Sequence, residues 1–223
     1  MQKYIVIVAG GMGKRMEKPI PKQFLEVNGR PILFYTIEKF FQYDNTINVY
    51  LVLPSDHIDY WKTLCEKFNF PIKHKIVAGG SERFYSVKNA IDTIEGEGLV
   101  GIHDGVRPFV SAETIEACYN TALEKGNAIP VVKLSDSIRQ ISQNSSEAVS
   151  RKNFRIVQTP QCFKLRLLKK AYQQPFNDFF TDDASVLESF GEKINLVEGN
   201  FENIKITTQF DLYLAEAIIK DLK

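Results

Sequence analysis

The stretch VAGGMGKRM, residues 8–16, decides how this sequence is interpreted. It places three glycines and two cations directly after the aliphatic run YIVIV, residues 4–8, which predicts a buried strand. A glycine-rich turn after such a strand exposes backbone N–H groups that can surround an anion, and Arg15 and Lys22 follow close behind. The stretch therefore predicts an anion site at the carboxyl end of the first strand.

Two well-known phosphate motifs do not match this turn. The P-loop pattern GxxxxGK[ST] is absent, because no Ser or Thr follows Lys14. The dinucleotide pattern GxGxxG starts at Gly11 and Gly13 but meets Met16 where the third glycine belongs. A P-loop kinase and a Rossmann dehydrogenase are thus disfavoured, although glycine turns of this kind also occur in proteins that bind nothing there.

Strand and helix signals alternate in the first half of the chain. Runs rich in β-branched residues predict strands at 4–8, 47–53, 73–78, 99–103 and 128–132. Helical patterns fall between them at about 31–43, 56–69, 82–95 and 112–125, the last with Ser111 as N-cap and Gly126 as its end. This alternation predicts a Rossmann-like α/β fold, a mostly parallel twisted sheet with helices on both faces that binds ligands at the carboxyl ends of its strands.

The alternation stops after Val132. The polar segment at about 133–153 has a turn-rich centre, SQNSSE, and predicts a protruding β-arm that needs a neighbour to pack on. Further on, the patterns predict helices at about 164–173 and 182–190, the second with Thr181 as N-cap and Gly191 as its end. Strands at 194–198 and 203–207 and a final helix from about 209 complete the expected elements.

Composition excludes several classes of protein. The chain has 223 residues and a formal net charge of +1, which does not favour binding nucleic acid or coating an anionic membrane. No apolar stretch approaches the roughly 20 residues that cross a bilayer, and no signal peptide is evident. The three widely spaced cysteines predict reduced thiols in a cytoplasmic protein, and the three histidines lack zinc-ligand spacing.

A series of ordered blocks resembles a known family. AGGMGKRM with PKQF is similar to the GxGxRM loop and PK motif of the sugar nucleotidyltransferase superfamily. GGSERFYSV (79–87), HDGVRPF (103–109), QTPQCF (158–163), TDDASVLE (181–188) and NIKIT (203–207) continue the resemblance. In kind and order these blocks resemble the 2-C-methyl-D-erythritol 4-phosphate cytidylyltransferase family over nearly the whole chain. The resemblance implies one nucleotidyltransferase domain over residues 1–223.

The resemblance implies a binding site for CTP. Catalytic cations would be Arg15, Lys22 and Lys205, of which the first two act on the phosphates through charge-assisted contacts. The nucleotide itself would be held by small residues and one hydroxyl: Ala9, Gly10, Gly11, Gly13, Gly80, Ser81, Ser86 and Gly105. Taken outside these blocks, Lys22 would be interpreted as a solvated loop lysine, and Ser81 also fits the N-cap of the helix that follows.

The resemblance also implies a metal ion and an acceptor. Asp104, just past a buried strand, would ligate Mg²⁺, and Arg107 would bind phosphate or orient that carboxylate; a purely structural ion pair is the alternative. Thr181, Asp182 and Lys205 would complete an acceptor site together with Asp104 and Arg107. Arg151 on the β-arm would reach the acceptor of a neighbouring subunit in a homodimer, unless it is an exposed arginine on a flexible hairpin.

The implied reaction transfers the cytidylyl group of CTP to methylerythritol phosphate with release of pyrophosphate. Two alternatives remain: the acceptor is ribitol 5-phosphate, or the chain is a non-catalytic nucleotide-binding module. A transferase for sugar 1-phosphates is disfavoured by the full set of blocks. The sequence departs from the family pattern at Tyr85, where a small polar residue is usual, and at Gly105 and Val106, where the usual form is HDAARP.

Overall fold

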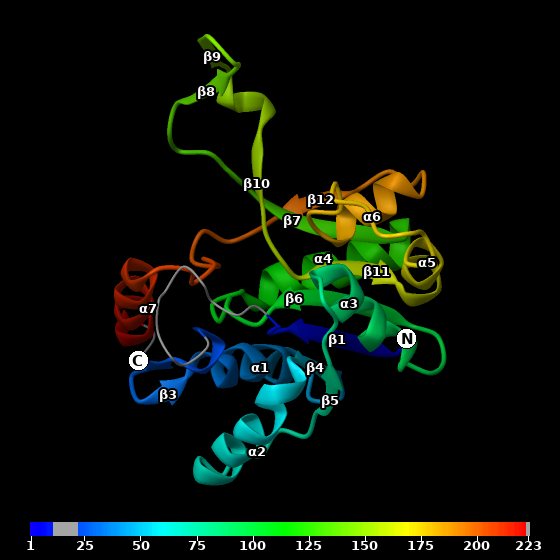
Figure 1. Cartoon of the computed structure of the whole chain (residues 1–223), viewed down its shortest axis with the longest axis vertical. Coiled ribbons are helices and arrows are strands. Elements are labelled where there is room, and N and C mark those ends of the chain that lie inside the picture. The colour runs from blue at the N-terminus through cyan, green and yellow to red at the C-terminus, as the bar shows by residue number, and fades with distance from the viewer. Residues whose placement is uncertain (11–21, 222–223) are drawn as a thin grey trace.

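The computed structural model describes residues 1–10 and 22–221, without the side chain of Lys22. An eight-stranded sheet runs through it in the order β10-β7-β11-β6-β1-β4-β5, with β12 also pairing with β7 (Figure 1). The strands are β1 (Lys3–Val8), β4 (Asn48–Leu53), β5 (Lys75–Ala78), β6 (Leu99–Asp104), β7 (Asn127–Lys133), β10 (Arg155–Val157), β11 (Gln161–Lys164) and β12 (Leu196–Glu198). The predicted α/β fold with a mostly parallel sheet is confirmed.

Parallel pairing brings two chain segments of the predicted site together. Strand β1 lies between β4 and β6 and is parallel to both, with Val8 opposite Val52 on one side and Asp104 on the other. The carboxyl ends of β1 and β6 therefore meet at one edge of the sheet, as an open α/β sheet requires for a ligand site.

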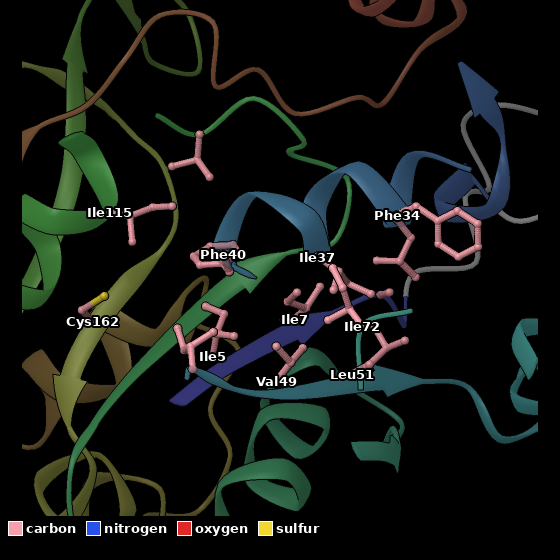
Figure 2. Packing of buried hydrophobic residues seen from close by; sticks show 14 of the residues in the cluster. Ile5, Ile7, Phe34, Ile37, Phe40, Val49, Leu51, Ile72, Ile115 and Cys162 are labelled. Atoms are coloured by element: carbon pink, nitrogen blue, oxygen red, sulfur yellow. The ribbon is translucent and has the colours of Figure 1, made fainter. Parts of the chain in front are cut away.

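Helices cover both faces of the sheet. The helices are α1 (Ile32–Tyr43), α2 (Ile58–Lys67), α3 (Arg83–Asp92), α4 (Ala112–Lys125), α5 (Leu165–Ala171), α6 (Asp183–Ser189) and α7 (Gln209–Asp221), with 3-10 turns η2 (Lys22–Phe24), η3 (Ser55–His57) and η4 (Arg151–Asn153). One face of β1 places Ile5 and Ile7 against α1, as Figure 2 shows, and the other places Tyr4 and Val6 in the cluster that includes α3, α5 and α6. Both faces are thus buried, as the unbroken apolar run of β1 predicts.

The arm is a separate two-stranded sheet. Strands β8 (Ile138–Ile141) and β9 (Ser146–Val149) pair antiparallel, and Figure 1 shows them standing well away from the main sheet at the end of the segments that continue β7 and β10. A second small hairpin, β2 (Glu26–Val27) with β3 (Arg30–Pro31), precedes α1. In residues 1–10 and 22–221 we find no helix with the length and apolar character to span a bilayer.

Three local predictions were wrong. Residues 203–207 do not form a strand; Ile206 donates its N–H to the carbonyl of Val106 at 3.0 Å outside any ladder. The N-cap of α6 is Asp182 and not Thr181, because Asp182 accepts from the N–H of Ser185 and completes a capping box with that serine. The N-cap of α3 is Glu82 and not Ser81, without a side-chain capping bond.

Candidate active site

Asp104 forms the centre of a charged cluster at the end of β6. Its carboxylate oxygen Oδ2 lies 3.1 Å from Nε of Arg107 and 3.0 Å from Nζ of Lys205. Burial alone would raise the pKa of Asp104, but the nearby positive charges, that of Lys205 foremost, outweigh burial and hold the pKa well below its usual range. Asp104 is therefore an ionised carboxylate next to the end of β1.

A short turn fixes the position of the Asp104 backbone. The N–H of Gly105 donates to the carbonyl of Val8 at 2.9 Å, which extends the pairing of β6 with β1 by one residue. The N–H of Arg107 then donates back to the carbonyl of Asp104 at 3.1 Å. A Cβ at Gly105 would lie 3.0 Å from Cβ of Ala9, so this glycine allows the two segments to approach closely. Val106 is buried, so the departure at this position fills the core.

His103 is a buried neutral histidine that supports this turn. Burial lowers its pKa to about 4. Its Nε2–H donates to the carbonyl of Arg107 at 2.9 Å, since a carbonyl can only accept, and its Nδ1 accepts from the hydroxyl of Thr159 at 3.0 Å. The same hydroxyl accepts from the N–H of Asp104 at 3.1 Å. The three hydrogen bonds define one tautomer and hold both ends of the turn.

Lys205 reaches the cluster from the segment that precedes α7, which belongs to no helix or strand. Asn203 donates from Nδ2 to the carbonyl of Thr159 at 2.8 Å and accepts at its own carbonyl from Arg107 at 2.7 Å. Ile206 is fully buried against the cluster that contains Val106. With Asn203 and Ile206 held on either side of it, Lys205 extends its side chain toward Asp104 while remaining 41% exposed. The ammonium is thus positioned by the carboxylate and open to a ligand.

Some of the residues predicted to bind the nucleotide lie around Ser86. The hydroxyl of this buried serine accepts from the N–H of Gly80 at 3.0 Å, so its own hydrogen can be donated to a ligand. A Cβ on Gly10 would lie 3.7 Å from the same hydroxyl, which places the end of β1 beside the loop before α3. Ala9 is buried and donates its N–H to the carbonyl of Val52, and Ser81 is exposed.

The departure at Tyr85 has a packing role. Its ring lies 5.4 Å from that of Phe84 and 5.7 Å from that of Phe176, within a group of aromatic side chains beside α3. A Cβ on Gly80 would lie 2.4 Å from Cβ of Tyr85, so the turn before α3 requires glycine at that position. Tyr85 therefore packs beside the loop.

The predicted acceptor residues lie at the start of α6. Thr181 is exposed, whereas the carboxylate of Asp182 is engaged by the N–H of Ser185 at 2.8 Å and by Nε2 of Gln161 at 2.8 Å. Gln161 also accepts from the N–H of Ala184, so β11 holds the start of the helix. Asp182 acts first as a helix cap.

The sequence patterns did not reveal an ion pair beside these residues. Arg83 forms two hydrogen bonds with the fully buried carboxylate of Asp183, at 3.0 and 2.6 Å. Arg83 lies inside GGSERFYSV and Asp183 inside TDDASVLE, but no local pattern pairs two residues so far apart in the sequence. Asp183 stands in the first turn of α6, where an acidic residue is common, so its position along the chain did not indicate its burial.

Some predicted residues are not brought to this cluster. Arg151 belongs to η4 on the arm and donates to the carbonyl of Ser135 within the arm, which stands apart from the end of β6 in Figure 1. Gly11, Gly13 and Arg15 lie outside the described residues. Lys22 begins η2, and its side chain also lies outside the description.

Asp104 is the candidate ligand for a metal ion at this site. In the described part of the chain, no group of three or more His, Cys, Asp and Glu residues could hold one. Asp104 supplies a single carboxylate, and both cations contact its Oδ2, so Oδ1 can serve a Mg²⁺ that takes its other ligands from phosphates and waters. The residues fit magnesium together with a phosphate-bearing ligand.

Comparison with known proteins identifies the family. The family model described as 2-C-methyl-D-erythritol 4-phosphate cytidylyltransferase matches residues 4–221. Proteins of that name from Phocaeicola vulgatus and Bacteroides thetaiotaomicron are 52% and 49% identical, each over 98% of this chain and 100% of the relative.

Solved structures agree with this match. The 4-diphosphocytidyl-2C-methyl-D-erythritol synthase of Anaerococcus prevotii superposes with a TM-score of 0.83 at 30% identity, covering 98% of this chain and 96% of that one. The 2-C-methyl-D-erythritol 4-phosphate cytidylyltransferase of Thermus thermophilus gives a TM-score of 0.80 at 30% identity over 99% of this chain and 100% of its own. This chain therefore belongs to the 2-C-methyl-D-erythritol 4-phosphate cytidylyltransferase family.

Proposed function

We propose that this chain transfers the cytidylyl group of CTP to 2-C-methyl-D-erythritol 4-phosphate. An oxygen of the acceptor phosphate attacks the α-phosphorus of CTP, the bond from that phosphorus to the β-phosphate oxygen breaks, and pyrophosphate leaves. The observation that carries this proposal is the Asp104 cluster, which sets two cations at the edge of the sheet where β1 and β6 end. Family membership supports the choice of both substrates.

Catalysis then depends on position and charge. A phosphate monoester is already a nucleophile, so neither a covalent intermediate nor a dedicated base is needed. Lys205, anchored by Asp104 and open to the site, orients the acceptor phosphate, and Arg107 contributes a second positive charge. Lys22 and Arg15 are proposed to stabilise the charge that develops on the transferred phosphate. Mg²⁺, when bound through Asp104 and the phosphates of CTP, supplies further charge neutralisation.

Recognition of the two substrates is proposed to come from separate segments. Ser86 and the backbone of Gly80 and Ser81 take the cytosine, because the Ser86 hydroxyl has a hydrogen to donate once it accepts from Gly80. Ala9, Gly10 and Gly105 provide close backbone approach to the nucleotide. Thr181 and the start of α6 take the acceptor, with the cap residue Asp182 holding that start in place.

A homodimer is proposed from the arm. Ile141 on the arm is 73% exposed, and after the arm Phe154 is 47% exposed and Ile156 51% exposed; Ile156 lies on β10, an edge strand of the main sheet. Exposed apolar residues on an edge strand favour pairing with another chain. A second copy would bring Arg151 of its arm to the acceptor.

A cytoplasmic location is also proposed. The free thiols of Cys65, Cys118 and Cys162 support it, because disulfides are rare in the cytoplasm.

Pyrophosphate release tests the proposal directly. The purified protein is incubated with CTP and Mg²⁺ and with methylerythritol 4-phosphate or ribitol 5-phosphate in separate reactions. We expect pyrophosphate release in the reaction with methylerythritol 4-phosphate and none in the reaction with ribitol 5-phosphate. Preference for ribitol phosphate would change the acceptor, and no release with either would favour a non-catalytic nucleotide-binding module. Lys22→Ala is expected to remain folded and bind CTP with little turnover, and normal turnover in that variant would remove Lys22 from the mechanism.

A further inference from the structure

A buried ion pair joins two helices beside the site. Asp183 is fully buried, and its two carboxylate oxygens accept from Nη1 of Arg83 at 3.0 Å and from Nη2 at 2.6 Å. The hydroxyl of Tyr172 donates to Oδ1 of the same carboxylate at 2.6 Å. Every oxygen of this buried group is thereby engaged in charge-assisted hydrogen bonds, which is the condition under which a carboxylate is tolerated away from water.

The pair connects the starts of two helices with different proposed ligands. Arg83 is the first residue of α3 and lies between Gly80 and Ser86, the residues proposed to bind cytosine. Asp183 is the first residue of α6 and follows Thr181 and Asp182, which are proposed to form the acceptor side. The ring of Phe84 also stacks on that of Tyr172, with centroids 4.7 Å apart and planes inclined by 21°.

The geometry makes the connection rigid. A bidentate guanidinium–carboxylate contact fixes both distance and orientation, unlike a single lysine contact. Moving α3 away from α6 would leave the carboxylate of Asp183 buried and unpaired, which is strongly unfavourable. The charge of Arg83 also persists, because the carboxylate of Asp183 raises its pKa although burial alone would lower it. The two helix starts therefore keep one relative placement.

We propose that Asp183 is a positioning residue that, through Arg83, holds the nucleotide segment of α3 and the acceptor segment of α6 in the relative placement that cytidylyl transfer requires. This inference rests on the proposed function, since it takes the ligands of the two segments from there. In-line attack depends on the alignment of two separately bound substrates, and a displacement of about 1 Å can cost about 100-fold in rate.

The main variant is Asp183→Asn, which keeps the shape of the side chain and removes its charge. We expect kcat/KM for both substrates to fall by about 10-fold to 100-fold, with a higher KM for CTP although Asp183 lies on the acceptor side. Arg83→Lys keeps the positive charge but loses the bidentate contact, so it should also lower kcat/KM for both substrates. In a double-mutant cycle, the two changes together should cost little more than the worse single change.

Two controls separate positioning from stability. Glu38→Gln breaks the bidentate pair of Arg30 with Glu38, at 3.3 and 2.6 Å, which ties α1 to β3 and involves neither α3 nor α6. It should leave both KM values unchanged. Tyr172→Phe removes one hydrogen bond from Asp183 but keeps the ion pair and the ring stacking, so its effect should be smaller than that of Asp183→Asn. Thermal unfolding of every variant verifies that it is folded.

Distinct outcomes overturn the inference and the proposed function. A folded Asp183→Asn protein with unchanged KM values and kcat would overturn the positioning role, as would an equal effect from Glu38→Gln. If Asp183→Asn does not fold, Arg83→Lys decides by the same criteria. If the wild-type protein releases no pyrophosphate, the proposed function fails. Calorimetric titration with CTP alone then tests the positioning role of the Arg83–Asp183 pair. An unchanged affinity for CTP in Asp183→Asn would overturn that role.

Discussion

The ammonium of Lys205 lies 3.0 Å from Oδ2 of Asp104, and the two partners differ in exposure: the lysine side chain is 41% exposed and the aspartate side chain 11%. A buried carboxylate thus anchors a cation whose other side is accessible. Because Arg107 also contacts this carboxylate, the charge of Asp104 does not depend on Lys205 alone, and the contact with Lys205 fixes the position of the ammonium.

The first prediction concerns Lys205→Ala. Removing a positioned charge that stabilises the transition state typically lowers kcat by about 10²-fold to 10³-fold, and we expect a loss of that size in pyrophosphate release. Because Arg107 still contacts Asp104, the variant should remain folded, with a lower thermal unfolding temperature since the buried carboxylate has lost one partner. Lys88→Ala is the matched control, since Lys88 forms a surface pair with Asp92 at 3.2 Å on α3 and should leave turnover unchanged. Equal turnover in both variants would contradict a role for Lys205.

The second prediction concerns His103 and pH. The folded protein keeps this histidine neutral down to its lowered pKa of about 4, whereas the unfolded chain protonates it near its ordinary value of about 6.5. The unfolded state binds more protons between these values, so the contribution of His103 to stability is complete above about pH 6.5 and is lost as the pH falls toward 4. The loss amounts to roughly 3 kcal/mol over that interval.

Urea unfolding at pH 7 and pH 4.5 measures this loss. His103→Gln should lower stability at pH 7, because Thr159 and the carbonyl of Arg107 lose their partner, but should reduce the difference between the two pH values. An undiminished difference in His103→Gln would show that other groups cause the acid sensitivity; His74, whose pKa burial also lowers, would be examined next.

Much of the fold followed from local patterns because its central strands are unambiguous. The run at 4–8 is apolar on both faces, as expected of a strand covered by helices on both sides, and its parallel neighbour carries Asp104 to the same edge. The end of the sheet was less predictable. Strand β11 inserts antiparallel between β6 and β7, a placement set by the path of the whole chain and not by the residues Gln161–Lys164.

The predicted strand at 203–207 shows how a pattern can mislead. Alternating Ile204, Lys205 and Ile206 has the period of a strand, and the structure uses that alternation to bury Ile206 and direct Lys205 to Asp104 without a ladder. Asp104, Arg107 and Lys205 were predicted from their blocks and do lie together. The pair of Arg83 with Asp183 was not predicted, because it is a contact between distant segments that no spacing in the sequence encodes.

The third prediction concerns Gly80→Ala. The new Cβ would lie 2.4 Å from Cβ of Tyr85, too close to be accommodated without moving the start of α3. We expect the free energy of unfolding to fall by about 1–3 kcal/mol, the range typical of overpacking, and the KM for CTP to rise. Gly10→Ala is the control for stability, because its Cβ would meet the Ser86 hydroxyl at an ordinary 3.7 Å. Wild-type stability and KM in Gly80→Ala would contradict the close approach of Gly80 to Tyr85.

The fourth prediction concerns the arm and the proposed dimer. Ile156 lies on the edge strand β10 with 51% of its surface exposed, and a buried charge at an apolar interface is unfavourable. Ile156→Asp should therefore shift the protein from dimer to monomer in sedimentation velocity and raise the KM for the acceptor. Asp136→Asn, an exposed change on the arm itself, should leave the sedimentation coefficient unchanged.

Mixing two inactive variants tests whether the dimer shares its sites. Lys205→Ala removes a group from the site within one chain, and Arg151→Ala removes the arm group proposed to reach the other chain. In a two-fold dimer, one site of each mixed dimer has both groups intact, so unfolding and refolding the variants together in equal amounts should restore about a quarter of wild-type activity. Refolding each variant alone should restore none. If the mixture stays as inactive as its components, Arg151 does not act across subunits, and the arm then serves association alone or remains within its own chain.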